Sequence, residues 1–100
     1  SYASSNKKAY RILMASVEPT VIKTKILPLI QKYGIAQVDN VKPGTQIPGG
    51  LYFNLHVPSK NLKNFITKIS TFSEATIFES RSQGGDLAGK NRVFIWVKGI

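Results

Sequence analysis

The segment NRVFIWVK, residues 91–98, decides the fold, because it is the most strand-like run in the chain and holds its one tryptophan. A strand turns alternate side chains to opposite faces. One face of this strand is aliphatic and suits a protein core: Val93, Ile95 and Val97. The other face has two large rings between two cations: Arg92, Phe94, Trp96 and Lys98. Such a face predicts a surface that binds nucleic acid, meets a protein partner, or lies beneath another element of the fold.

The composition predicts one folded domain. A chain of 100 residues with 42% hydrophobic and 19% charged residues is too apolar and too weakly charged for a disordered protein. We expect residues 1–9 to be a flexible lead-in, whose polar sequence resembles a trimmed terminus, and residues 10–100 to form the domain. The absence of cysteine from the sequence excludes disulfides and thiolate sites. The longest apolar run, residues 93–97, is far shorter than the roughly 20 residues that span a bilayer.

The net charge is +9, from 14 Lys+Arg and 5 Asp+Glu. This excess indicates attraction to an acidic surface such as nucleic acid, anionic lipid or an acidic protein. The cations are dispersed along the sequence, and their one adjacent pair is Lys7-Lys8. Dispersed cations also suit a protein that uses them for solubility, so the sequence leaves both interpretations open.

Residues 10–34 predict a strand followed by a helix. Residues 10–17 are apolar at both parities, which is typical of a central strand with little water on either face. Pro19 suits the first turn of a helix and Gly34 its end, while Pro28 is tolerable if it faces solvent. One helical stripe lies between them: Ile22, Ile26, Leu29, Ile30 and Tyr33.

The rest of the chain continues this alternation of strand and helix. We expect strands at residues 35–41, 51–57 and 75–82, a loop at 42–50, and a turn at 83–90 before the final strand. A second helix begins with Ser59 as its N-cap. Its stripe is Leu62, Phe65, Ile66, Ile69 and Phe72. The polar parity of strand 51–57 is Tyr52, Asn54 and His56.

The element order is therefore β-α-β-β-α-β-β. It predicts an α+β fold of the ferredoxin-like split β-α-β type, with an antiparallel sheet and two helices on one face. The other face is open unless something covers it. The sequence does not decide on which side of the fourth strand the fifth strand lies.

The sequence offers little to a catalytic site. His56 is the one imidazole, and a lone histidine on a strand is more often an exposed sheet residue than a general base. The acidic residues show no helical pairing that suits a carboxylate pair or a metal cage: Glu18, Asp39, Glu74, Glu79 and Asp86. Residues 84–90 resemble a phosphate-binding loop but lack its Ser/Thr and the helix that should follow, so we expect a hairpin turn. We therefore expect no enzyme activity, no cofactor and no metal site.

Nucleic acid is the alternative partner. An RNA-recognition module shares the β-α-β-β-α-β order and stacks bases on its central strands. The strand GGLYFNLHV, residues 49–57, lacks the basic residue that the signature of that module has before the glycine. Phe94 and Trp96 belong to a fifth strand, which that module does not use. The net charge favours single-stranded nucleic acid, and the missing signature opposes it.

The stretch GGLYFNLHVPSKNLKNFITKISTFSEATIFESRSQ, residues 49–83, resembles a bacterial family of extracytoplasmic lipoproteins of unknown function. Members have a strand ending in Val-Pro, a helix containing a Phe, and a short turn into a Ser-rich strand. Residues 10–41 look like the first strand, helix and second strand of that family, whereas residues 83–90 stand where its helical hairpin would be. The resemblance implies export to the cell envelope and no enzyme activity, and it carries over no functional residues.

We therefore expect a non-enzymatic binding or regulatory module of the bacterial cell envelope or periplasm, held at a membrane only by a lost N-terminal anchor. A protein partner would contact the open sheet face, or the fifth strand if that strand lies at an edge. The candidate contact residues are Tyr52, His56, Arg92, Phe94, Trp96 and Lys98. The sequence leaves open the identity of the partner, the oligomeric state (a homodimer included), and whether Phe94 and Trp96 are exposed or form a second core.

Overall fold

The computed structural model describes residues 8–38, 41–81 and 88–100. Its elements in chain order are β1 (Lys8–Ser16), α2 (Pro19–Lys32), β2 (Ala36–Gln37), β3 (Thr45–Ile47), β4 (Gly50–Pro58), a short 3₁₀ helix η1 (Ser59–Asn61), α3 (Leu62–Ile69), β5 (Ala75–Arg81) and β6 (Lys90–Gly99). The predicted lead-in lies outside the described residues as far as residue 7, and residues 8 and 9 already belong to β1. Most of the predicted turn at 83–90 lies outside them as well.

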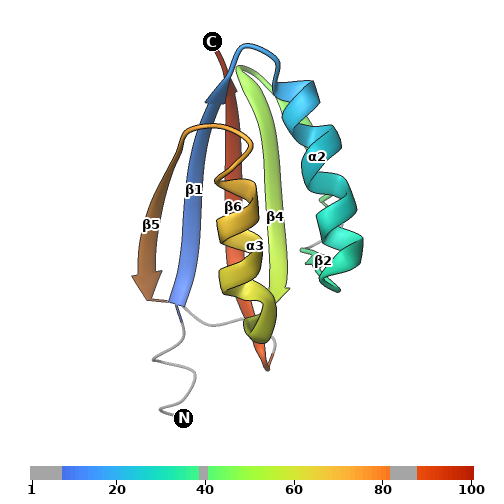
Figure 1. The fold of residues 1–100 in the computed structure, drawn as a ribbon, viewed down its shortest axis with the longest axis vertical. Coiled ribbons are helices and arrows are strands. Elements are labelled where there is room, and N and C mark those ends of the chain that lie inside the picture. The colour runs from blue at the N-terminus through green and yellow to red at the C-terminus, as the bar shows by residue number, and fades with distance from the viewer. Residues whose placement is uncertain (1–7, 39–40, 82–87) are drawn as a thin grey trace.

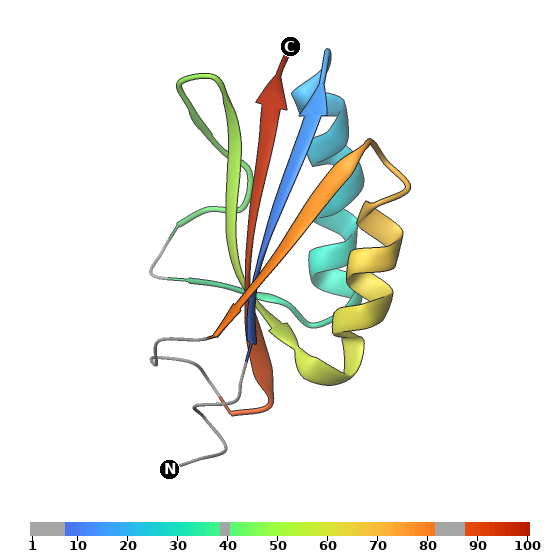
Figure 2. The same cartoon turned by 90° about the vertical axis from the view of Figure 1, so that its left-hand side faces the viewer.

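The predicted α+β class is confirmed, with both helices on one side of a single sheet (Figures 1 and 2). The strand order is β2-β4-β6-β1-β5, and β3 also pairs with β4. The predicted antiparallel sheet is wrong, because β6 pairs parallel to β1 while β4 and β5 pair antiparallel to their neighbours. The sheet is therefore mixed.

The structure places β6, whose position in the sheet the sequence left open. The last strand does not lie beside β5, because β1 lies between them. It lies instead in the middle of the sheet, paired along its length with β4 on one side and β1 on the other. The hypothesis that this strand offers a free edge is therefore wrong. A central position suits a strand whose alternate side chains are all fully buried, because it keeps them away from water.

The core lies between the sheet and the two helices. The residues that we predicted for it from β6, Val93, Ile95 and Val97, are fully buried. Both predicted helical stripes face this core, and their most buried members are Ile22, Ile26, Leu29, Phe65 and Ile69. Pro28 is exposed as expected, and Gly34 follows the end of α2 with a φ of 66°, in the left-handed region that glycine adopts readily. Neither α2 nor α3 is long and apolar enough to cross a membrane.

The start of the second helix differs from the prediction. Ser59 does not cap α3, which begins at Leu62 after the 3₁₀ turn. The Ser59 hydroxyl instead donates to Oδ1 of Asn91, and Nδ2 of Asn91 donates to the backbone oxygen of Lys8 over 2.8 Å. The buried Asn91 side chain thus joins η1, β6 and β1. A buried amide with both ends satisfied specifies one arrangement of the segments it connects.

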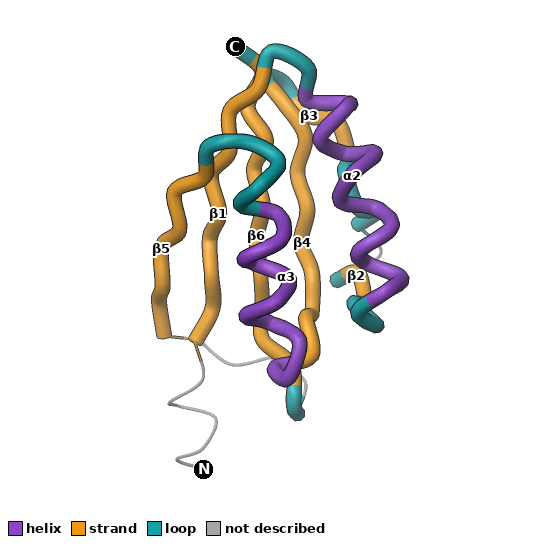
Figure 3. Tube along the Cα trace, viewed as in Figure 1, coloured by secondary structure: helices purple, strands orange, loops and turns teal. Residues whose placement is uncertain are grey.

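The segment between α2 and β4 was predicted least well. The strand expected at residues 35–41 is only Ala36–Gln37, and residues 39–40 lie outside the described part of the chain. The expected loop at 42–50 contains β3, which forms a hairpin with β4. Its turn needs only Pro48 and Gly49, and Gly49 has a φ of 93°. Both short strands lie at the β4 edge of the sheet (Figure 3).

We predict that Gly50→Ala destabilises the protein by about 2 kcal/mol, a typical effect of overpacking. A Cβ at Gly50 would collide with the backbone carbonyl of Val97, which cannot move without disturbing the pairing of β4 with β6. Gly99→Ala is the matched control, because its Cβ would lie 3.4 Å from Cγ of Pro19 and meet no closer atom. Urea unfolding of both variants measures the difference. Equal stabilities would contradict this close pairing.

We also predict that stability falls as the pH rises above 10.0. Burial raises the pKa of Tyr10 above its ordinary value of 10.0, and the Glu79 carboxylate raises it further. The folded state then holds the phenol proton more tightly than the unfolded state, so deprotonation favours unfolding. Thermal unfolding between neutral pH and pH 11 measures this loss. Tyr10→Phe should lose less stability over the same range, and an identical loss in both proteins would assign the effect to other groups.

Candidate binding face

The side of the sheet away from α2 and α3 is the surface on which the predicted contact residues lie. We name it the open face, since neither helix lies over it (Figure 2). It is formed by alternate residues of four strands. These are Tyr52, Asn54 and His56 of β4, Arg92, Phe94, Trp96 and Lys98 of β6, Arg11, Leu13 and Ala15 of β1, and Thr76, Phe78 and Ser80 of β5.

Strand register arranges the centre of the open face in two rows. In the first row, Phe94 lies between Asn54 and Arg11, and Arg11 in turn lies beside Phe78. In the second row, Trp96 lies between Tyr52 and Leu13. Directly opposed residues of neighbouring strands have Cβ atoms about 4.5–5.5 Å apart, so the side chains of each row are in contact range. The sequence predicted the β4 and β6 members of these rows.

Two arginines hold Phe94. The Cζ atom of Arg11 lies 4.8 Å from the centre of the Phe94 ring, and the Cζ atom of Arg92 lies 4.9 Å from it. Nη2 of Arg92 also donates to Oδ1 of Asn54 over 3.1 Å. A guanidinium group within about 6 Å of a ring centre is attracted to the negative face of the ring. The centre of the open face therefore presents two positive charges fixed on an aromatic ring.

A hollow of about 410 Å³ lies next to Trp96. Its lining combines apolar side chains, Leu13 and Trp96 among them, with the charged side chains of Lys98 and Glu74. The indole points toward the β3–β4 turn, since a Cβ added at Gly49 would lie 3.7 Å from Cζ2 of Trp96. The same side chain lines the hollow.

The exposure of the aromatic and apolar side chains is graded across the open face. Phe94 and Trp96 are half-buried, Leu13 is 44% exposed, and Phe78 is 50% exposed. Our expectation that β1 has little water on either side is therefore wrong for this face, since Arg11 and Leu13 are exposed there. Half-buried rings held by neighbours, beside exposed aliphatic carbon, form neither a closed second core nor a mobile surface.

His56 lies at the end of the open face near β2 and is 7% exposed. The expectation of an exposed sheet histidine is therefore wrong. Register places it between Ala36 of β2 and Arg92 of β6. In the part of the chain that the structure describes, no group of three or more His, Cys, Asp or Glu side chains is placed to hold a metal ion. His56 is thus a packed member of the face.

The charge on the open face is mainly positive. Arg11, Arg92 and Lys98 lie on it, and Glu74 lines the hollow. Glu79 belongs to the helix side, opposite Tyr10 in the register. The cations that are dispersed in the sequence are therefore partly gathered by the fold.

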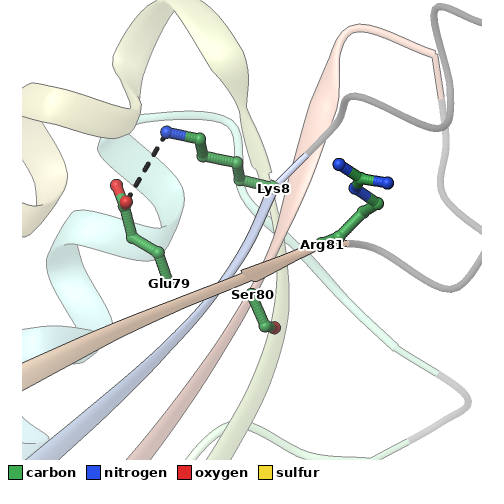
Figure 4. Close-up of a pocket in the computed structure, with 4 residues that line it drawn as sticks. All are labelled: Lys8, Glu79, Ser80 and Arg81. Carbon is green, nitrogen blue, oxygen red and sulfur yellow. Dashed lines mark ion pairs between the residues drawn. The ribbon is translucent and has the colours of Figure 1, made fainter.

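A second hollow, of about 400 Å³, lies at the end of β5 and is lined by Lys8, Glu79, Ser80 and Arg81 (Figure 4). Nζ of Lys8 lies 3.5 Å from Oε2 of Glu79, while Arg81 extends away from this pair. Both paired side chains are more than half exposed, and such ion pairs contribute about 0–1 kcal/mol to stability. These residues suggest no catalytic chemistry.

Comparison of the chain with models of protein families, with curated proteins and with solved structures found no match.

We predict that Phe94→Ala lowers the free energy of unfolding by about 1–2 kcal/mol, from the two cation–π contacts and partial burial. The adjacent Ile95→Ala should cost about 3 kcal/mol, because Ile95 is fully buried on the helix side. Urea unfolding compares the two variants. A cost for Phe94→Ala as large as that for Ile95→Ala would mean that the open face is a second core rather than a surface.

Proposed function

We propose that this chain is a non-enzymatic binding module of the bacterial cell envelope that engages a protein partner through the open face. The observation that carries the proposal is the hollow lined by Leu13 and Trp96, on the same helix-free face as Phe94 and the two arginines that contact its ring. Residues of these types dominate the energy of protein interfaces when they lie near the centre of the contact.

Side chains of the open face that neighbouring residues hold in place support a binding role. Phe94 is held by Arg11 and Arg92, whose Cζ atoms lie 4.8 Å and 4.9 Å from the centre of its ring. Side chains that are already ordered lose less conformational entropy when a partner covers them. Leu13 and Phe78, which are more exposed, add apolar surface around this ordered centre.

The charges favour a partner with an acidic surface. The open face carries Arg11, Arg92 and Lys98, and the whole chain has a net charge of +9. Complementary charge of this kind speeds encounter and orients the partner before the apolar contacts form. Carboxylates of the partner would therefore meet these cations, and an apolar side chain would enter the hollow.

Single-stranded nucleic acid is the alternative occupant, because rings and arginines together suit bases and phosphates. Two features favour protein. The ring of Phe94 already has two guanidinium groups close to it, which leaves less of its surface for a stacked base. Leu13 adds aliphatic surface, which contributes to a protein interface but not to base stacking.

The finer fold class belongs to the same proposal. The two helices on one face and the sequence of β1, β2, β4 and β5 across the sheet support a ferredoxin-like split β-α-β plan with β6 inserted beside β1. The envelope location, and the relation to a family of extracytoplasmic lipoproteins, are supported by the sequence patterns of residues 10–41 and 49–83.

A titration followed by Trp96 fluorescence tests the proposed function. The probes are a synthetic peptide of alternating glutamate and leucine and, separately, single-stranded oligothymidylate, each at low and at physiological salt. We expect the peptide to shift the emission of Trp96 saturably at both salt concentrations, because apolar contacts persist when charges are screened. We expect the response to oligothymidylate to disappear at the higher salt, because phosphate contacts depend steeply on salt.

Leu13→Ser and Leu27→Ser are the matched pair for this titration. Both leucines are partly exposed, Leu13 at 44% on the open face and Leu27 at 38% on α2. Leu13→Ser should weaken peptide binding about tenfold, which corresponds to about 1.4 kcal/mol, and Leu27→Ser should leave it unchanged. Tighter binding of oligothymidylate than of peptide at physiological salt would favour the nucleic-acid alternative. No response to either probe would refute the open face as a binding surface.

A further inference from the structure

β5 lies at an edge of the described sheet, and it is exposed at that edge and on both of its faces. It pairs with β1 from Ala75 to Arg81 and has no strand on its other side in the described sheet. Figure 1 shows that neither α2 nor α3 lies over it. Each of its residues from Thr76 to Arg81 is exposed. An edge strand in this situation presents a row of backbone N–H and C=O groups that can pair with another strand.

The two edges of the sheet differ in how they are protected. At the β4 edge, β2 has two residues and β3 has three, and Pro48 follows β3 directly. Short strands and proline are common devices against edge-to-edge pairing. The β5 edge has seven residues in unbroken register with β1, and it contains neither proline nor a bulge. Of the two edges of the sheet as described for residues 8–38, 41–81 and 88–100, the β5 edge is the one with the length to accept a new strand.

Apolar side chains lie on both sides of β5. Ile77 points to the helix side and is 41% exposed, and Phe78 points to the open face and is half exposed. On the helix side, a groove of about 370 Å³ separates β5 from α3. Its apolar lining is Tyr10, Leu62, Ile66 and Ile77. Strand pairing at this edge would therefore be accompanied by burial of apolar surface on both sides of the sheet.

The distribution of charge indicates which partner would pair with the β5 edge. The chain as a whole is strongly positive, so two copies repel each other over most of their surface. The β5 edge is less positive, since Glu74 and Glu79 offset Lys8 and Arg81 and Lys63 is the further charged residue that lines the groove. An acidic partner would be attracted to the basic open face rather than to this edge. A second copy of the chain, in contrast, meets less charge repulsion here than over the rest of the surface.

We propose that β5 pairs antiparallel with β5 of a second copy, which makes a twofold dimer with one continuous sheet. This inference goes beyond the proposed function and does not rest on it. A twofold axis perpendicular to the sheet keeps the helices of both copies on one side and makes the interface self-complementary. Ile77 of each copy then lies on the helix side of the dimer, beside the grooves between β5 and α3. Phe78 of each copy lies near the twofold axis on the open face. The two open faces become neighbours on one surface.

Sedimentation equilibrium over a wide range of protein concentration tests the dimer. The variants are Ile77→Lys and its matched control Val21→Lys, because Ile77 is 41% exposed on β5 and Val21 is 40% exposed on α2. We expect a monomer–dimer equilibrium in the unmodified protein. Ile77→Lys should raise the dissociation constant at least about tenfold, and Val21→Lys should leave it unchanged. Far-ultraviolet circular dichroism checks that both variants are folded.

Amide hydrogen exchange of the unmodified protein gives a second measurement that does not depend on any variant. Protection of the amides of Ala75–Arg81 should rise with protein concentration, because their outward groups become paired in the dimer. A monomer at every concentration would overturn the proposal. So would a dimer that Ile77→Lys leaves intact, an equal effect of the two lysine variants, or a dimer without added protection in β5.

Discussion

The rest of the structure depends on the double pairing of β6. This strand pairs antiparallel with β4 and parallel with β1, and it brings Val93, Ile95 and Val97 fully into the core. Because alternate side chains of a strand point to opposite faces, the intervening side chains of β6 must lie on the open face, at the middle of the sheet. The aromatic rings of β6 lie on the open face because the same strand anchors the core.

The central place of β6 also explains how dispersed cations become a local charge. Arg11 and Arg92 are distant in the sequence, but parallel pairing of β1 with β6 brings both guanidinium groups to the ring of Phe94. Each arginine gains a contact with an aromatic ring that offsets part of the cost of holding two positive charges close together. Cations whose dispersed positions in the sequence suggest a role in solubility are therefore gathered by the fold into a positive centre.

Local patterns predicted local structure well and strand pairing poorly. The stripes of α2 and α3 and the alternation of β4 and β6 follow from helical and strand periods, so the burial of Phe65 and Ile95 and the face of Trp96 were predictable. Strand order depends on distant contacts that no local pattern encodes. For this reason the neighbours of Trp96 and Phe94 on β1 and β5, the burial of His56 and the mixed sheet were not predictable from the sequence.

The insertion of β6 accounts for the exposure of β5 on the helix side. Neighbouring strands lie about 4.8 Å apart and packed helices about 8–10 Å apart, so one helix covers about two strands. Two helices therefore cover about four strands, whereas the path β2-β4-β6-β1-β5 contains five. In Figure 1, α2 lies on the side of the sheet toward β4 and β2, α3 lies in front of β6, and neither helix lies over β5. The strand that gives the open face its rings thus also leaves Ile77 and the groove beside α3 exposed, so the open face and the uncovered β5 edge have one geometric cause.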